Sequence, residues 1–333
     1  MLVVKANFEQ YFSQLLEECR AEKEVGFDTE TTALFWWACP HYAERPRVFS
    51  MQFATAKNDY YFDFGAQWST DALGAEHFAR FRELFELADL LWFIQNAKFD
   101  MHHSANHDLR IAGTVHCTQA AARLVNNEEK DCSLDGLSKT YLGAEKIDLS
   151  EYWKDESRVT KVNKPGGRIY EFLHFDRLPQ DISVNYGERD TRLVYDLGRW
   201  QVAKLQELNQ RYFGAMPSSF GGSLLRVLDN ERQLTKTLFE MERRGVQLDM
   251  PFVKEAHAAA IQGIKDALAT LDPQAKGYVD KYNASSPKEP LEVMDWQSHI
   301  HLKGLFDFLG LAYTYTEEEN ASFTKDNLEK LEH

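Results

Sequence analysis

Three short acidic strings, in a fixed order along the chain, constrain its fold more than any other feature. They are Asp28-Thr29-Glu30, Asn96-Ala97-Lys98-Phe99-Asp100 and Tyr186-Gly187-Glu188-Arg189-Asp190. Side chains two residues apart on a strand share one face, and side chains four residues apart on a helix point the same way. The chain must therefore fold so that four carboxylates and one tyrosine, far apart in sequence, serve a common site.

Carboxylates that cluster without cysteine predict a site for hard divalent cations. Asp28 and Glu30 repel each other on one strand face unless a cation lies between them, and oxygen ligands suit Mg²⁺ or Mn²⁺ better than zinc. With Asp100 and Asp190, the set predicts two ions about 3.5–4 Å apart, suited to in-line displacement at a phosphodiester. Tyr186, with an ordinary pKa of about 10, is expected to orient the attacking water by a hydrogen bond.

Each string taken alone has a simpler interpretation. Asp28-Thr29-Glu30 is also typical of a strand end that enters a solvated loop. Asp100 is also typical of an acidic residue in the first turn of a helix, where the helix dipole favours it. Tyr186 with Asp190 also fits a buried tyrosine beside a surface acid. Only the combination, in this order, favours a metal site.

Composition indicates a folded protein with room for two domains. The 333 residues are 44% hydrophobic and 13% aromatic, which is enough for packed cores. The formal net charge of −14 argues against broad adhesion to DNA or to anionic membranes. The cysteines show no paired short spacing, and His102, His103 and His107 have no cysteine spaced for zinc. With no signal peptide or membrane-length apolar run, we expect a cytoplasmic protein.

Hydrophobic patterning predicts alternating strands and helices in the first half of the chain. Strands are expected over 24–28, 48–55, 60–64 and 90–94, and helices over 8–19, 78–88, 117–125 and 179–200. Asn96 is expected to cap the helix that carries Asp100. Residues 154–168 are expected to form a basic loop, which either grips a phosphate backbone or is a mobile surface loop.

A stretch rich in glycine, proline and serine, 214–222, predicts the boundary between domains 1–213 and 214–333. After it, helices are expected over 224–244 and from Asp249 to about residue 271, followed by turns and short helices. The second domain is therefore expected to be mostly helical.

The ordered strings resemble the 3′→5′ proofreading exonuclease domain of family A DNA polymerases, in the tyrosine-bearing branch of the four-carboxylate exonucleases. The histidine branch would carry His where this chain has Asn185. The resemblance covers roughly residues 20–205. It implies an α/β domain like ribonuclease H, with a mixed sheet of about five strands and helices on both faces.

The resemblance also implies roles for individual residues. The metal ligands would be Asp28, Glu30, Asp100 and Asp190, and these four would form the catalytic set together with Tyr186. Contacts with the 3′-terminal nucleotide would come from Thr31, Leu34, Gln95 and Asn96. The aromatic run Phe35-Trp36-Trp37 either stacks on a nucleobase or belongs to the core beneath the site.

The second half is similar to the start of a polymerase thumb. Residues 240–249 resemble the segment that opens the thumb, and 295–310 and 323–331 continue the similarity. The chain departs from the family pattern at Cys117-Thr118, where Asp-Thr is common, and at His299, where proline is expected. The palm and fingers are missing, so the chain is either a piece of a longer polymerase or one part of a split one, and it cannot polymerise alone.

The predicted activity is divalent-metal-dependent hydrolysis of DNA from the 3′ end, with release of nucleoside monophosphates. Its expected partners are the 3′ end of single-stranded or primer-template DNA and the missing polymerase half. Two alternatives stay open. One is an RNA-trimming 3′→5′ exonuclease of the same carboxylate class, and the other is a catalytically silent subunit that docks DNA or a polymerase.

Overall fold

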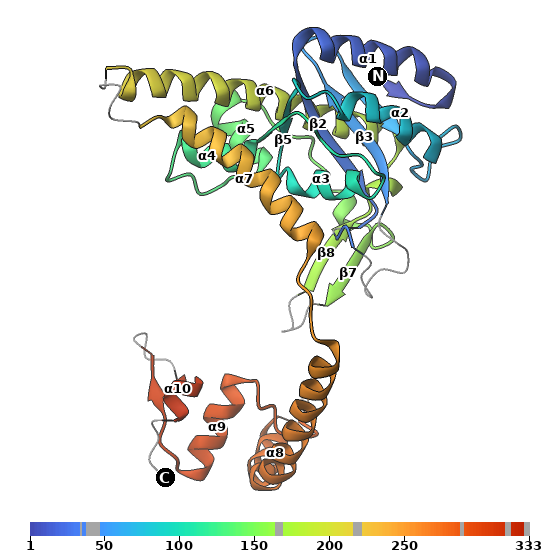
Figure 1. Ribbon diagram of the computed structural model, residues 1–333. Helices are drawn as coiled ribbons and strands as arrows, with labels where there is room; N and C mark the ends of the chain where they lie inside the picture. The colour runs from blue at the N-terminus through green and yellow to red at the C-terminus, as the bar shows by residue number, and fades with distance from the viewer. Residues whose placement is uncertain are drawn as a thin grey trace. The chain divides into compact units, whose positions relative to one another are not determined.

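The computed structural model describes residues 1–33, 35–37, 47–163, 169–215, 222–286, 290–316 and 321–329. The chain falls into two compact units, Met1–Gly245 and Val246–His333 (Figure 1). The first unit contains all three acidic strings. None of the helices within the described ranges is long and apolar enough to cross a bilayer.

A mixed sheet of six strands forms the centre of the first unit, in the order β1-β4-β3-β2-β5-β6. The strands are β1 (Leu2–Val3), β2 (Glu24–Thr31), β3 (Val48–Ala54), β4 (Asp59–Asp63), β5 (Leu91–Ile94) and β6 (Thr114–Cys117). β2 runs antiparallel to β3 and parallel to β5, and β5 runs parallel to β6. The α/β fold is confirmed. The sheet has six strands where about five were expected. Patterning predicted four of them and missed the two-residue β1 and the four-residue β6, which are too short for alternation to reveal.

Helices cover both faces of this sheet (Figure 1). They are α1 (Phe8–Glu22), α2 (Ala75–Phe85), α3 (Lys98–Ala105), α4 (Thr118–Val125), α5 (Leu134–Leu142), α6 (Gln180–Phe213) and α7 (Leu224–Arg244). α1, α2 and α3 bury their apolar sides with Val25, Phe27 and Trp92 in one core. α4, α5 and α6 pack with Phe93 in another core. Because strand side chains alternate, Asp28 and Glu30 belong to the face that α6 covers.

Glycines let α6 approach the sheet closely. A Cβ atom added at Gly198 would lie 2.1 Å from Cδ1 of Phe93, and one added at Gly26 of β2 would lie 2.8 Å from Cβ of Tyr195. No side chain fits at such distances without a shift of the helix or the strand. The helix with the third acidic string is therefore fixed at short range from the strand with the first.

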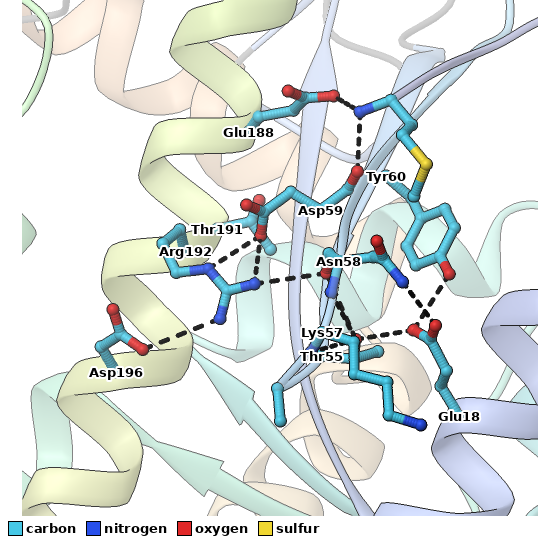
Figure 2. Close-up of polar contacts among 12 residues, drawn as sticks. Glu18, Thr55, Lys57, Asn58, Asp59, Tyr60, Glu188, Thr191, Arg192 and Asp196 are labelled. Atoms are coloured by element: carbon cyan, nitrogen blue, oxygen red, sulfur yellow. Dashed lines mark hydrogen bonds and ion pairs between the residues drawn. The ribbon is translucent and has the colours of Figure 1, made fainter.

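A polar network also ties α6 to the turn between β3 and β4 (Figure 2). Arg192 of α6 lies 2.7 Å from the carboxylate of Asp59 and donates to the carbonyl of Asn58 at 3.3 Å. On the other side of the turn, the buried Glu18 of α1 accepts hydrogen bonds from Thr55, Asn58 and Tyr60. Burial alone would raise the pKa of Glu18, but these donors outweigh it and lower the pKa. The turn thus joins α1 to α6.

The second unit contains α8 (Met250–Ser285), α9 (His299–Leu309), the short strands β9 (Thr314–Tyr315) and β10 (Ala321–Ser322), and α10 (Lys325–Leu328). Side-chain caps begin the two longer helices, with Asp249 accepting from Phe252 N–H and Ser298 from His301 N–H. A small core joins α8 to α9 through buried residues that include Ala275, Val279 and Leu305. The unit is mostly helical, as expected.

The limits of the compact units differ from the predicted limits 1–213 and 214–333. The chain divides after Gly245, because α7 buries Leu228 and Phe239 against the first unit. The stretch rich in glycine and proline, of which 216–221 lies outside the described residues, connects α6 to α7 within that unit. Composition marks a loop here, and tertiary packing decides whether a loop is also a domain boundary.

Two local predictions were wrong. Asn96 does not cap the helix that follows, because Ala97 occupies the N-cap of α3 and Asn96 has φ 51°. Asparagine tolerates this left-handed conformation, which here turns the chain from β5 into α3. Residues 154–168 are not a loop throughout: β7 (Val159–Asn163) pairs antiparallel with β8 (Ile169–Leu173). β7 has only two apolar residues, Val159 and Val162, which do not alternate with period two, and 164–168 lie outside the described residues.

The close approach of α6 generates the first prediction. Gly198→Ala is expected to lower the free energy of unfolding by about 1–3 kcal/mol, because the added methyl group collides with the buried ring of Phe93. Denaturant unfolding measures this change. Gln206→Ala, at an exposed position of the same helix, serves as the control and should stay within about 0.5 kcal/mol of the parent. Equal stability of the two variants would contradict the proposed packing.

Candidate active site

The first string lies where β2 emerges from its pairing with β5. The parallel pairing ends at Gly26, whereas the antiparallel pairing with β3 continues and sets Asp28 opposite Gln52 and Glu30 opposite Ser50. The register shifts between Glu30 and Thr31, so the regular strand ends just after the second acid. Both carboxylates are thereby held on strand backbone at an edge where a following helix can approach them.

Asp100 joins the first string through Thr29. It lies in the first turn of α3, directly after β5, and is almost fully buried. Its Oδ1 accepts from the backbone N–H of Thr29 at 2.9 Å and from the Thr29 hydroxyl at 2.7 Å. Sequence reasoning missed this role of Thr29. The signal was available in the hydroxyl that stands between the two acids of the first string.

Asp190 and Tyr186 enter from α6, and both are buried. Asp190 Oδ2 forms an ion pair with Lys146, while Asp190 Oδ1 is buried without a hydrogen-bond partner among the described residues. The ring of Tyr186 packs on Phe175 at a centroid distance of 5.2 Å, and the Lys146 ammonium lies 4.9 Å from its centroid. Lys146 was also missed, because nothing in its local sequence links it to an acidic string.

The four carboxylates influence one another electrostatically. Burial, and then the charge of Asp190, raise the pKa of Asp28 to about 7, although Lys146 works in the opposite direction. Burial, followed by Asp28 and Asp190, raises the pKa of Glu30 well above its ordinary value. The pKa of Asp100 is raised by burial and by Asp28, and that of Asp190 by burial. The structure therefore brings together all four predicted ligands as one acidic centre.

This centre fits divalent cations by its chemistry. Its negatively charged groups are all carboxylates, whose oxygens are the ligands that such cations prefer, and these carboxylates repel one another. One of the oxygens, Asp190 Oδ1, is buried without a hydrogen-bond partner among the described residues. Across the described ranges, no three side chains of His, Cys, Asp or Glu already converge at the spacing of metal ligands. The acids are neighbours, and the ammonium group of Lys146 forms an ion pair with one of them, Asp190.

The predicted nucleotide contacts have different surroundings. Thr31 is buried and donates to the carbonyl of Ala33 at 2.8 Å. Gln95 uses both ends of its amide inside the fold, donating to the carbonyl of Cys132 and accepting from Thr118. Asn96 is exposed just after the end of β5, where it lines a pocket with Lys98, Arg123 and Glu231. Leu34 lies outside the described residues.

The aromatic run after β2 is divided between packing and exposure. Trp36 stacks on His102 at 4.2 Å between ring centroids and lies under the guanidinium of Arg243 at 4.7 Å. Trp37 stacks on Phe35 at 4.7 Å and is 48% exposed. Trp36 is therefore clamped between α3 and α7, while Trp37 presents an aromatic face to solvent.

Comparison with known proteins identifies the family of this chain. Residues 4–200 match the family model of a 3′-5′ exonuclease, and the chain belongs to this family. It is 27% identical over 233 residues to DNA polymerase DpoZ of Salmonella phage PMBT28 and 24% identical to DNA polymerase DpoZ of Acinetobacter phage SH-Ab 15497. Both alignments cover 68% of this chain and 31% of the relative. The chain thus spans about a third of the length of these curated relatives.

A solved structure supports the fold over nearly the whole chain. The polymerase domain of Pol1 from M. smegmatis, in complex with DNA primer-template and dNTP, matches with a TM-score of 0.58 and 17% identity. The match covers 95% of this chain and 43% of that one. The resemblance to the exonuclease region of family A DNA polymerases is confirmed, and with it the class of enzyme, a hydrolase of phosphodiester bonds.

The link between Thr29 and Asp100 generates the second prediction. Thr29→Val keeps the side-chain shape but removes one donor to a buried carboxylate, which should lower the free energy of unfolding by about 1–3 kcal/mol. Because ligand orientation is lost, divalent-metal affinity should fall about 10- to 100-fold. Denaturant unfolding and Mn²⁺ titration measure the two effects.

Thr237→Val is the matched control, because its hydroxyl contacts only a backbone carbonyl on the exposed side of α7. It should change neither quantity appreciably. If Thr29→Val behaves like this control, Thr29 does not orient Asp100.

Proposed function

We propose that this chain is a divalent-metal-dependent exonuclease that removes nucleoside monophosphates from the 3′ end of DNA, as the proofreading part of a DNA polymerase. One observation carries the proposal. Carboxylates from β2, α3 and α6, half-buried on β2 and buried on the two helices, raise one another's pKa on the fold of a 3′-5′ exonuclease family. Such an arrangement destabilises the folded protein unless cations bind to it. Cations bound there would in turn bind the phosphate of a substrate, which is the function that the cluster would serve.

Asp28, Glu30, Asp100 and Asp190 are the proposed ligands of two Mg²⁺ or Mn²⁺ ions. Dependence on divalent metals is typical of the family. When bound, such ions activate water and neutralise charge on the phosphate and the leaving 3′ oxygen. The chain's own contribution is to fix the ligand directions, with β2 backbone holding Asp28 and Glu30 and Thr29 holding Asp100.

Tyr186 is the proposed positioning group for the attacking water. Burial, and then the charges of Asp190 and Glu30, raise the pKa of its hydroxyl well above the ordinary value. The hydroxyl therefore keeps its proton at neutral pH and acts as a hydrogen-bond donor and acceptor rather than as a base. Its ring is held by Phe175, so the hydroxyl has a defined direction.

The proposed substrate is the 3′ end of single-stranded or primer-template DNA. Asn96 is exposed, so its amide is free to reach a nucleotide, unlike that of Gln95. Thr31 and Gln95 would act mainly by shaping the backbone around the nucleotide, since their polar groups are used internally. Exposed Trp37 offers a face on which a base can stack. The similarity to phage DNA polymerases favours DNA over RNA.

The second unit is the proposed beginning of a thumb, and the rest of a polymerase is its proposed partner. The relatives are about three times as long as the matched region, which leaves room for palm and fingers outside this chain. The match to a polymerase domain over 95% of the chain supports the same assignment.

The third prediction tests the function through Asp28. Asp28→Asn should lower the rate of 3′ mononucleotide release by on the order of 10²–10³-fold, since it removes a ligand charge without changing shape. A 5′-labelled single-stranded DNA, with Mg²⁺ or Mn²⁺ and with EDTA as the blank, reports the shortening. Asp89→Asn changes the same charge at an exposed acid paired with Lys23 and should leave the rate unchanged.

Two further outcomes decide between the alternatives. Faster shortening of an RNA of the same sequence would replace the DNA exonuclease by an RNA-trimming enzyme. If the folded parent protein releases no mononucleotide with either metal, the hypothesis of a catalytically silent docking subunit replaces both exonuclease hypotheses. Full activity of Asp28→Asn would remove Asp28 from the site.

A further inference from the structure

A lysine side chain occupies the acidic centre. Lys146 pairs with Asp190, and its side chain is only 25% exposed, against 6% for its partner. Its ammonium also lies over the ring of Tyr186. We propose that Lys146 is a built-in counter-ion, which neutralises Asp190 before metal binds, competes with the divalent cation for that carboxylate, and moves to the substrate phosphate when the cation displaces it. This inference rests on the proposed function.

The backbone around Lys146 is held by contacts that do not involve its ammonium. Gly143 ends α5 with φ 62°, which turns the chain back toward α6. Arg189 then donates to the carbonyl of Glu145 at 3.0 Å, and the Lys146 backbone N–H stabilises the carboxylate of Asp135. Because these contacts fix the loop from both sides, the side chain can change its partner while the loop stays in place.

Electrostatics favours an ion in this position. Burial disfavours the charged ammonium, but Asp190, and then Asp28 and Glu30, outweigh burial and raise the pKa of Lys146. In return, Lys146 lowers the pKa of each of these three acids. The lysine thus reduces the repulsion that a metal ion would otherwise be required to relieve. A cation that binds Asp190 must take over this role and displace an existing ion pair.

A neighbouring pocket gives the displaced ammonium another place to lie. The pocket has a volume of about 570 Å³ and is lined by the rings of Trp153, Phe175 and Tyr186, by the cations Lys139 and Lys146, and by the acids Asp135, Glu145 and Asp148. Trp153 is 42% exposed, so an aromatic face is open to solvent beside the lysine. A nucleotide needs the same pair of partners, one for the base and one for the phosphate. The four-carbon stem of lysine lets the ammonium turn from Asp190 toward this space.

The fourth prediction measures metal affinity without nucleic acid or catalysis. Lys146→Met should bind Mn²⁺ about threefold to tenfold more tightly than the parent in a calorimetric titration, because its competitor is gone. Lys146→Arg should retain the parental affinity. Lys139→Met, which removes a nearby exposed charge paired with Asp135, is the control and should also bind like the parent.

A second measurement tests the counter-ion role directly. In EDTA, Lys146→Met should unfold at a lower temperature than the parent, and saturating Mn²⁺ should shrink the difference. In an Asp190→Asn background, Lys146→Met should no longer change Mn²⁺ affinity, since the ion pair is already absent. If Lys146→Met does not fold in EDTA, as strong repulsion would cause, it is refolded with Mn²⁺, and its Mn²⁺ affinity is compared with that of the parent by competition with a chelator.

The outcomes separate this inference from the proposed function. If folded Lys146→Met binds Mn²⁺ as tightly as the parent or more weakly, and the parent shortens DNA, the counter-ion role of Lys146 is wrong and the proposed exonuclease function stands. Tighter binding by Lys146→Met in a protein that releases no nucleotide supports the counter-ion and removes the exonuclease.

Discussion

Repulsion among carboxylates that are partly or fully removed from water is the constraint on which the rest of this structure depends. Asp100 and Asp190 are buried, Asp28 and Glu30 are half-buried, and the charge of one raises the pKa of another. A fold gains nothing from such a cluster, since buried unpaired charge is costly. It persists because strong packing elsewhere holds β2, α3 and α6 together. The surrounding fold can therefore be understood as a set of devices that keep these three elements in place against their own charges.

Those devices act at different distances from the acids. Thr29 holds Asp100 by direct hydrogen bonds, and Lys146 neutralises Asp190. Further away, Gly198 lets α6 approach the sheet, and Arg192 ties the same helix to the turn between β3 and β4 (Figure 2). Of these groups, only Lys146 is proposed to contact a substrate. Each limits the freedom of α6 or α3, so the position of the third acidic string is determined by packing as well as by its own residues.

The sequence predicted best those helices and strands in which one hydrophobic period continues from the first residue to the last. The helix 224–244 was predicted with the bounds that α7 has, and the buried strands beside the site were found to within a few residues. The edge strand β1, the four-residue β6 and the hairpin of β7 and β8 were missed. β1 and β6 are too short to show a period, and the two valines of β7 do not alternate. The compact-unit limit after Gly245 was missed because packing of α7, not the composition of a loop, determines it.

The same distinction explains which site residues could be found. Within each acidic string, local spacing fixes the relative direction of the side chains, so all four proposed ligands and Tyr186 could be named from sequence and lie together in the structure. Lys146 has no such spacing, since it comes from a loop whose path is set by the end of α5 and by a contact with Arg189. The net charge of −14 was equally uninformative about the site. Salt screens the distant surface charges, so a single lysine beside the acids changes the electrostatic field at the site more than those charges do.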